Sequence, residues 1–388
     1  MTITGLGAAG PATAQAAVSG SWPQLEGNAA HTGDEPGENS INRGNARQLS
    51  VAWTAPLPAG EGTGNDVVVT GGVLYTSDGP VVTALNAQTG AQLWQLTFPS
   101  YVDTPSVADG LVLVGYGEQL HAHVKTYIRA LNATTGATVW TRKIGSIDSP
   151  ITVTAHLAYF LTGTQVEAIE LSNGYKFWIS PGLAGCSLSA PTVADGYVLV
   201  GAGGDVSALH ASTGALAWHD TLSDGCEGST NNWVPAISQG TVYAGLIDGV
   251  DAISLTSGTV LWHTPSTSGV VFPVTLTSQY VLASVDSTSQ LVALNRSTGA
   301  QVWQTAFAKS EEIVGTYVFG NLAWFLQQPN AGGGGTRINA VDAGTGNRDF
   351  SSVTYADQDQ GFPPVADAGR VYMSTGNEVV CYALPGAA

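Results

Sequence analysis

The sequence predicts an all-β fold, an eight-bladed β-propeller of four-stranded antiparallel blades. Three observations predict it: a unit of about 40 residues repeats along the chain, each copy ends in a glycine followed four residues later by an aromatic residue, and the strands between turns are short. Four short strands per unit of this length are typical of propeller blades. A β-solenoid is the competing repeat fold, but its coils are much shorter than this unit.

The repeat is clearest in seven segments that contain a Thr-Gly, Asn-Gly or Ser-Gly turn. They are ALNAQTGAQLW (84–94), ALNATTGATVW (130–140), AIELSNGYKFW (168–178), ALHASTGALAW (208–218), AISLTSGTVLW (252–262), ALNRSTGAQVW (293–303) and AVDAGTGNRDF (340–350). Glycine supplies the positive φ that a tight antiparallel connection requires. An upstream pattern, as in PSVADGLVLVG (105–115) and PTVADGYVLVG (191–201), predicts the first two strands of each blade.

The two ends of the chain predict how the ring closes. Residues 49–388 divided by a mean spacing of about 42 give eight blades, and seven blades is the alternative. The segment 364–384 supplies three strands without a fourth, whereas 49–56 supplies only a fourth strand, with Trp53. Pairing the two would form one mixed blade and leave no free sheet edge.

The aromatic residue of each fourth strand is predicted to pack between neighbouring blades. A buried Trp ring covers about 150–250 Å² of apolar surface, which favours a structural role over a catalytic one. The predicted structural residues are Trp53, Trp94, Trp140, Trp178, Trp218, Trp262, Trp303 and Phe350.

The chain divides into three parts. Residues 1–20 are small and apolar and end near an A-x-A signature, Ala14-Gln15-Ala16, so they are interpreted as a truncated signal-peptide-like tail, with a plain small-residue tail as the alternative. Residues 21–48 form a segment that leads into the ring, and residues 49–388 form a single propeller domain. We therefore expect a secreted, extracellular protein.

Charge and cysteine content narrow the partners and the compartment. The acidic net charge of −17 argues against nucleic acid, and no apolar run is long enough to span a membrane. Cys186 and Cys226 each lie eight residues after the Trp of their copy, which predicts a disulfide in an oxidising compartment. Cys381, in an apolar strand, is predicted to be a buried thiol. We expect a monomer.

The seven copies, which cover about residues 50–388, resemble the tryptophan-docking repeat of the PQQ-type propeller superfamily. That superfamily includes eight-bladed quinoprotein alcohol dehydrogenases and non-catalytic outer-membrane assembly factors. The copies differ from WD repeats, because none ends in Trp-Asp. The segment SWPQLEGNAAHTG (21–33) is similar to the start of secreted bacterial members known only as PQQ-like repeat proteins.

The resemblance does not transfer either activity to this chain. Quinoprotein dehydrogenases stack their quinone on a disulfide between adjacent cysteines, and this sequence has no adjacent cysteines. Their long insertions have no room in 388 residues, and their calcium-binding and catalytic-base motifs are not matched. The lipidation cysteine of the assembly factors is also missing. We expect no cofactor, and PQQ with calcium is the disfavoured alternative.

The loops that precede the innermost strands predict a ligand site at the mouth of the central channel. Aspartates hold this position in the first three blades, and aromatic residues hold neighbouring positions in later blades. The predicted ligand-binding residues are Asp66, Asp103, Asp148, Asn231, Asn232, Trp233, Phe272 and Phe362. Such a mouth would take a cation or an amphiphilic small molecule. The alternative is that each Asp accepts hydrogen bonds from its own loop.

Residues with acid–base chemistry lie near the same loops. His121 and His123 are two apart in an extended segment, so both rings would share one face, but no third metal ligand is identifiable; they are weak metal candidates. His121, Tyr101, Asp103 and Asp148 are the catalytic candidates. No GxSxG, HExxH or CxxC motif is present.

We therefore expect a PQQ-like propeller that binds a small molecule or a protein at its channel mouth. One alternative is an enzyme with its active site there, either a divergent quinoprotein oxidoreductase or a cofactor-free lyase or cyclase. A second alternative is a cell-envelope assembly scaffold.

Overall fold

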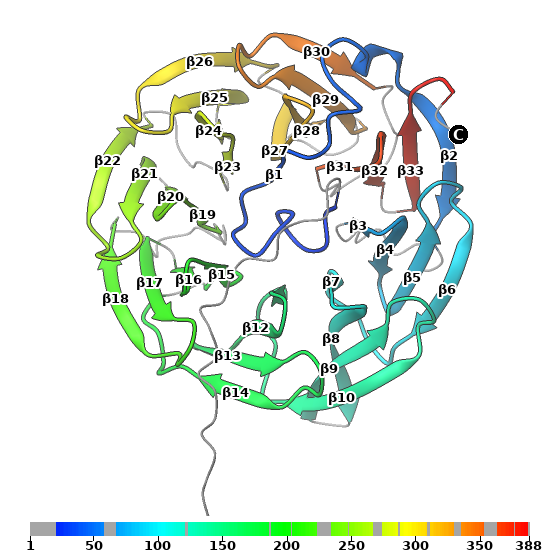
Figure 1. Cartoon of the computed structure of the whole chain (residues 1–388), viewed down its shortest axis with the longest axis vertical. Coiled ribbons are helices and arrows are strands. Elements are labelled where there is room, and N and C mark those ends of the chain that lie inside the picture. The colour runs from blue at the N-terminus through cyan, green and yellow to red at the C-terminus, as the bar shows by residue number, and fades with distance from the viewer. Residues whose placement is uncertain are drawn as a thin grey trace, which may run out of the picture.

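Eight β-sheets surround a central axis in the computed structural model (Figure 1). It describes residues 21–57, 67–120, 123–185, 188–202, 204–222, 234–246, 248–266, 274–285, 288–308, 311–329, 335–352, 363–375 and 377–386. In each blade the strands A to D run in order from the axis outward. The prediction of eight blades is confirmed, and the alternative of seven is excluded.

The first four blades follow one another in the chain. Blade 1 contains β3 (Val68–Thr70), β4 (Val73–Asp78), β5 (Val81–Asn86) and β6 (Gln92–Thr97). Blade 2 contains β7 (Ser106–Ala108), β8 (Leu111–Leu120), β9 (His123–Asn132) and β10 (Thr138–Ile144). Blade 3 contains β11 (Thr152–Val153), β12 (Leu157–Thr162), β13 (Gln165–Glu170) and β14 (Lys176–Ile179). Blade 4 contains β15 (Thr192–Ala194), β16 (Tyr197–Ala202), β17 (Asp205–His210) and β18 (Leu216–Thr221).

The last four blades complete the ring. Blade 5 contains β19 (Ala236–Ser238), β20 (Thr241–Gly245), β21 (Gly249–Ser254) and β22 (Val260–Pro265). Blade 6 contains β23 (Thr275–Leu276), β24 (Tyr280–Val285), β25 (Gln290–Asn295) and β26 (Gln301–Ala306). Blade 7 contains β27 (Glu311–Phe319), β28 (Leu322–Pro329), β29 (Arg337–Asp342) and β30 (Arg348–Ser351), with the short β1 (Asp34–Glu35) parallel to β27. Blade 8 contains β31 (Val365–Asp367), β32 (Arg370–Ser374), β33 (Glu378–Ala383) and β2 (Ser50–Pro56).

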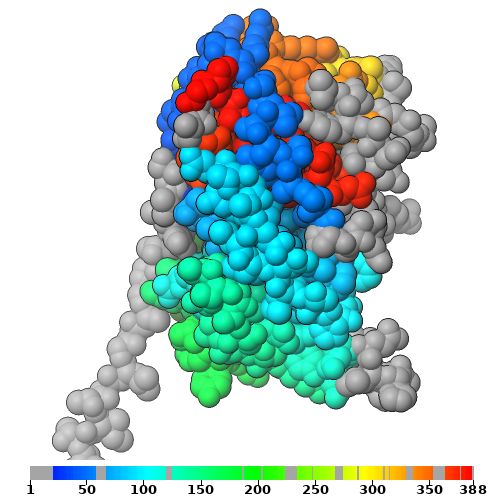
Figure 2. All heavy atoms as spheres, turned by 90° about the vertical axis from the view of Figure 1, so that its right-hand side faces the viewer, coloured from blue at the N-terminus to red at the C-terminus, as the bar shows by residue number. Residues whose placement is uncertain are grey.

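The two ends of the chain close the ring in the predicted way. β2 pairs antiparallel with β33, from Ser50 opposite Ala383 to Pro56 opposite Glu378, and Trp53 lies opposite Cys381. Figure 2 shows these N-terminal residues in blue against the C-terminal residues in red. Cys381 is fully buried and forms no disulfide, as predicted.

In seven of the eight blades, a Trp in strand D packs on the C–D turn of the next blade and locks the two blades together. Its Nε1 donates to a backbone carbonyl of that turn at 2.7–3.3 Å. In chain order from Trp53 to Trp303, the acceptors are Ala87, Ala133, Leu171, Ala211, Leu255, Arg296 and Ala343. A Cβ on the glycine of the same turn would lie less than 3.0 Å from the indole ring. The glycine is therefore required for close approach of the ring as well as for its positive φ.

The junction between blades 7 and 8 differs from the other seven, because blade 8 takes its fourth strand from the start of the chain. Phe350 packs there against Trp324 of its own blade and edge-on against Tyr382 of blade 8, with ring centroids 5.5 and 6.1 Å apart. Each of the eight aromatic residues therefore contacts the neighbouring blade.

Helical structure is almost absent. The described residues contain a single 3₁₀ turn, η1 (Ala46–Gln48), and no helix with the length and apolar character needed to cross a bilayer.

Candidate functional site

The ring has two faces with different connections. The face that carries the A–B and C–D turns is called the turn face, and the face that carries the B–C and D–A connections is called the loop face. The site predicted from the sequence belongs to the loop face, since Asp103 and Asp148 lie in the D–A connections before β7 and β11.

The N-terminal segment 21–38 runs through the centre of the ring and contacts the inner strands in chain order (Figure 1). It is the part of the molecule that sequence reasoning missed. Its contacts are mostly backbone hydrogen bonds of 2.6–2.9 Å. They join Trp22 to Val69, Pro23 to Val107, Ala29 to Val193, Ala30 to Ile237, Thr32 to Leu276 and Gly33 to Val318.

Side chains of the same segment complete the circle. Gln24 exchanges two hydrogen bonds with the backbone of Val153 in blade 3, at 2.7 and 3.0 Å. Glu38 accepts a hydrogen bond from the Gly369 N–H in blade 8, at 2.9 Å. The segment thus links the inner edges of all eight blades. No pattern in the sequence indicates this role, since the burial of Trp22 and Gln24 is a property of the folded structure.

Hydroxyl groups form a second belt between neighbouring inner strands. Ser106, Thr152 and Thr192 each donate to the carbonyl of Ile151, Pro191 or Pro235 in the next blade, at 2.5–2.7 Å. His31 is 1 % exposed and lies within hydrogen-bonding distance of Thr192 Oγ1 at 3.0 Å. Burial lowers the pKa of His31 to about 3, so the ring is neutral at physiological pH.

Asp103 lies on the loop face, in the connection before β7. Solvent reaches the residue, yet desolvation by surrounding protein raises the pKa of its carboxyl to about 6. The surface around this carboxylate is called the Asp103 surface. Within the described part of the chain, its carboxylate accepts no hydrogen bond, and a Cβ placed on Gly115 would lie 3.1 Å from its Oδ2.

The backbone around Asp103 is held by blade 2. Its N–H donates to the carbonyl of Gly115, and its own carbonyl accepts from Ser77 of blade 1, at 3.3 and 3.1 Å. The adjacent Tyr116 stacks on Tyr127, and Arg129 donates to its hydroxyl at 2.7 Å. These contacts fix the position of Asp103 without using its carboxylate.

Asp148 has a different environment in the equivalent loop of blade 3. Its carboxylate accepts hydrogen bonds from Ser146 Oγ at 2.5 Å and from the Gly163 N–H at 2.7 Å. Both donors belong to the local connections, so this carboxylate stabilises its own loop.

The other predicted site residues are only partly covered by the structure. Tyr101 is 56 % exposed and precedes Asp103 in the same loop. His123 begins β9, and its side chain is not described. The remaining predicted positions, which lie outside the described residues, are Asp66, His121, Cys186, Cys226, Asn231, Asn232, Trp233, Phe272 and Phe362. Their roles stay predictions, as does the disulfide.

A group of acids lies at the opposite end of the channel. Burial, together with Glu35, raises the pKa of Asp34 to about 7, and burial together with Glu38 raises the pKa of Asp367 to about 6. Glu35 and Glu38 accept hydrogen bonds from backbone N–H groups. In the ranges that the structure covers, no three Asp, Glu, His or Cys side chains are arranged to hold a metal ion.

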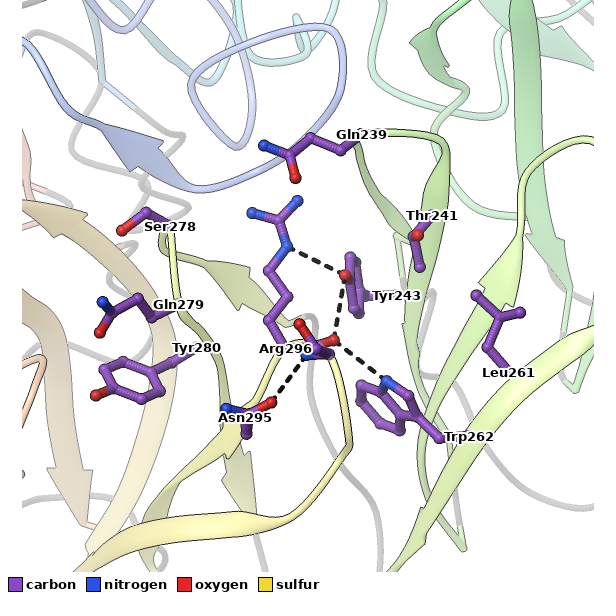
Figure 3. A pocket seen from close by; sticks show the side chains of 11 residues that line it. Gln239, Thr241, Tyr243, Leu261, Trp262, Ser278, Gln279, Tyr280, Asn295 and Arg296 are labelled. Atoms are coloured by element: carbon purple, nitrogen blue, oxygen red, sulfur yellow. Dashed lines mark hydrogen bonds between the residues drawn. The ribbon is translucent and has the colours of Figure 1, made fainter.

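Grooves open on the turn face between neighbouring blades. One, of about 610 Å³, lies between blades 5 and 6 and is lined by Tyr243, Trp262 and Arg296 (Figure 3). Another, of about 410 Å³, lies between blades 1 and 2 and includes Tyr75, Ala133 and part of the N-terminal segment.

Comparison with known proteins places this fold in a defined group. The family model described as outer membrane protein assembly factor BamB matches residues 37–181, 124–271 and 248–386. Among curated protein sequences, none matches the chain. The structure is similar to that of BamB from Moraxella catarrhalis, with 17% identity, a TM-score of 0.67, and coverage of 86% of this chain and 99% of the other.

Oxidoreductases share the fold as well. Quinohemoprotein alcohol dehydrogenase ADHIIG from Pseudomonas putida HK5 has 15% identity, a TM-score of 0.70, and coverage of 95% of this chain and 81% of the other. The enzyme of the same kind from Comamonas testosteroni has 15% identity, a TM-score of 0.67 and the same two coverages. At these identities the likeness shows the fold alone.

The residues of this chain do not match the quinone site described above for quinoprotein dehydrogenases. Its cysteines, Cys186, Cys226 and Cys381, are not adjacent in sequence, and the described residues offer no group of three metal ligands.

Proposed function

The chain belongs to the family of PQQ-like propellers that the outer membrane protein assembly factor BamB represents, and from this premise we propose that it is a binding module. Its site is the Asp103 surface on the loop face, and it takes a basic group. That group is either a free organic cation or a basic side chain of a partner protein.

The accessible carboxylate of Asp103 is the observation that carries the proposal. An Asp that serves its own loop accepts hydrogen bonds from nearby donors, as Asp148 does with its Oδ2. Asp103 has no such donor among the described residues, and partial desolvation raises its pKa to about 6. A cation that binds beside Asp103 would gain from the reduced solvation of this carboxylate, because charge–charge attraction grows as the effective dielectric falls.

Two matched variants test the proposal. We expect Asp103→Asn to weaken binding of spermidine about tenfold or more at pH 7.5, since one charge-assisted interaction contributes about 1.5–3 kcal/mol. Asp148→Asn retains binding and is expected to lower the melting temperature instead, because its loop loses acceptor strength. Binding is measured by isothermal titration calorimetry at 150 mM salt, because this salt concentration screens the weak attraction of spermidine to the acidic surface as a whole.

The two sources of the basic group are separated by a second probe. An end-blocked Gly-Lys-Gly peptide represents a partner's side chain, and spermidine represents a free cation. Selective binding of either one by the wild type identifies the source. Equal loss of binding in both Asp variants, or no binding of either probe, contradicts the proposal.

Family membership supports a second candidate, an assembly scaffold of the cell envelope that binds proteins along its rim. The match of the BamB family model to residues 37–386 favours it. If a protein partner purified with the wild type remains bound to Asp103→Asn, the scaffold function is supported, and the partner does not bind at the Asp103 surface.

A further inference from the structure

The groove between blades 5 and 6 carries a charge that distinguishes it from the equivalent groove between blades 1 and 2. Among the described residues that line it, Arg296 is the one charged side chain. The groove between blades 1 and 2 is lined by one acid, Asp109, and by no base. The two grooves therefore present opposite charges on one scaffold.

The positions correspond by hydrogen bonding as well as by sequence. Arg296 and Ala133 each accept the indole N–H of the preceding blade through the backbone carbonyl, at 3.2 and 2.9 Å. Their backbone N–H groups donate to Gln279 and Gly110, both at 2.9 Å. Since the structural work at this position is done by the backbone, the arginine side chain is not required for the fold.

The guanidinium group of Arg296 is held in place from one side. Nε donates to the Tyr243 hydroxyl at 3.1 Å, Nη1 donates to the Thr277 carbonyl at 3.0 Å, and the Cζ atom lies 5.3 Å from the centre of the Tyr243 ring. Nη2 has no acceptor in the part of the chain that the structure describes. Figure 3 shows the group pointing to the end of the groove where Gln239 and Ser278 lie.

No carboxylate of the described residues forms an ion pair with Arg296. Arg43, Arg47, Arg142 and Arg337 each contact an acid within 4.0 Å, whereas Arg296, Arg129 and Arg348 do not. The acid that senses the charge of Arg296 is Asp34, whose burial raises its pKa to about 7, so this acid is largely protonated at pH 6.

We propose that this groove binds a small organic carboxylate. The carboxylate would contact the guanidinium, which is preorganised by Tyr243 and Thr277 for charge-assisted hydrogen bonds. The organic part would lie between Tyr280 on one side and Tyr243 and Trp262 on the other, the arrangement that Figure 3 shows. The site is separate from the Asp103 surface, which is on the loop face and is proposed to bind a group of the opposite charge.

Benzoate is the probe, with benzamide as its neutral counterpart and inorganic phosphate as a non-planar anion. At pH 6, NMR titration should show benzoate shifting the resonances of Tyr243 and Trp262, with benzamide at least tenfold weaker. Arg296→Ala should weaken benzoate about tenfold or more. This variant is expected to fold, because alanine stands at the same position in four other blades, as in Ala133. Arg296→Lys should recover part of the affinity, since it keeps charge but not the planar fork.

The outcomes separate cleanly. Benzoate binding that persists in a folded Arg296→Ala protein, equal binding of benzamide, or no shift at Tyr243 with any probe overturns the proposal. Phosphate binding stronger than benzoate also overturns it, because the site would then select charge and not the planar carboxylate. Loss of binding in Arg296→Ala with an unchanged melting temperature supports it.

Discussion

Two grooves on the turn face, one between blades 1 and 2 and one between blades 5 and 6, have the same framework of contacts between blades but different side chains on their surface. Both have a Trp locked onto a Gly turn, and both have a Tyr whose hydroxyl reaches the same backbone carbonyl, Tyr75 to Ala133 at 3.2 Å and Tyr243 to Arg296 at 3.4 Å. They differ in the side chain at the carbonyl and in the turn beside it, where Asp109 replaces Ser278.

This difference shows how the surface of a repeat fold can vary in charge while the contacts between blades stay the same. The lock uses an indole ring, a glycine and a backbone carbonyl, so the side chain next to the carbonyl can be small or charged. The same reasoning separates Asp103 from Asp148. The carboxylate of Asp148 accepts hydrogen bonds within its own loop. The loop of Asp103 is held by backbone contacts, so the carboxylate of Asp103 is not used to hold it.

The largest expected effect comes from breaking the shared lock. Trp94→Ala and Trp262→Ala should each lower the free energy of unfolding by about 3–5 kcal/mol, as expected for truncation of a large packed ring. Chemical denaturation measures this loss. Leu93→Ala is the control, because Leu93 is 50% exposed beside Trp94 and should change stability by about 0.5 kcal/mol or less. Similar stability of Trp94→Ala and Leu93→Ala would contradict the lock.

An intermediate effect is expected from the N-terminal segment, which lines the first groove. The folded pKa of His31, about 3, lies below its usual 6.5, so the unfolded chain binds a proton first as the pH falls. The stability that His31 contributes is complete above pH 6.5 and is lost progressively toward pH 3. Asn tolerates the positive φ of this residue, so His31→Asn should fold and show a shallower loss of stability below pH 6.5.

The comparison with the wild type is essential in that experiment. The raised pKa values of Asp34, Asp103 and Asp367 act with the opposite sign, since their contribution is complete near pH 4 and is lost as the pH rises toward 6 or 7. They are the same in both proteins and cancel in the difference. Parallel stability curves for wild type and His31→Asn would show that His31 is not buried in the neutral form.

The smallest expected effect is a transfer of the carboxylate site to the first groove. In the Arg296→Ala background, Ala133→Arg should restore weak benzoate binding, shifting Tyr75 resonances. Asp109 competes for the new guanidinium, so adding Asp109→Ser should strengthen binding several-fold. If the single and the double variants bind equally, the charge difference between the grooves is not what controls ligand choice.

The sequence predicts the framework well, because its determinants are local and repeated. The spacing from Gly136 to Trp140, copied along the chain, encodes both the turn and the packing residue, and Trp53 without partner strands predicts ring closure. Backbone contacts leave no comparable pattern. Segment 21–38 binds the inner strands mainly through main-chain groups, so its path could not be derived from its side chains.

The candidate site was harder to predict for a physical reason. Asp103 and Asp148 both precede an inner strand, and nothing in the sequence indicates that Ser146 and Gly163 occupy one carboxylate and not the other. The departure of Arg296 from the alanine of other copies was visible in the segment ALNRSTGAQVW (293–303), but its lack of a carboxylate partner depends on the three-dimensional arrangement.

The most direct test of the proposed binding function is an NMR titration of the Asp103 carboxyl carbon with and without spermidine. The expected result is a pKa near 6 in the free protein that falls when spermidine is present, because a bound cation favours the ionised form. A pKa close to the ordinary value of about 3.9, unchanged by spermidine, would contradict the claim that the carboxylate of Asp103 is partly desolvated, accessible and binds the cation.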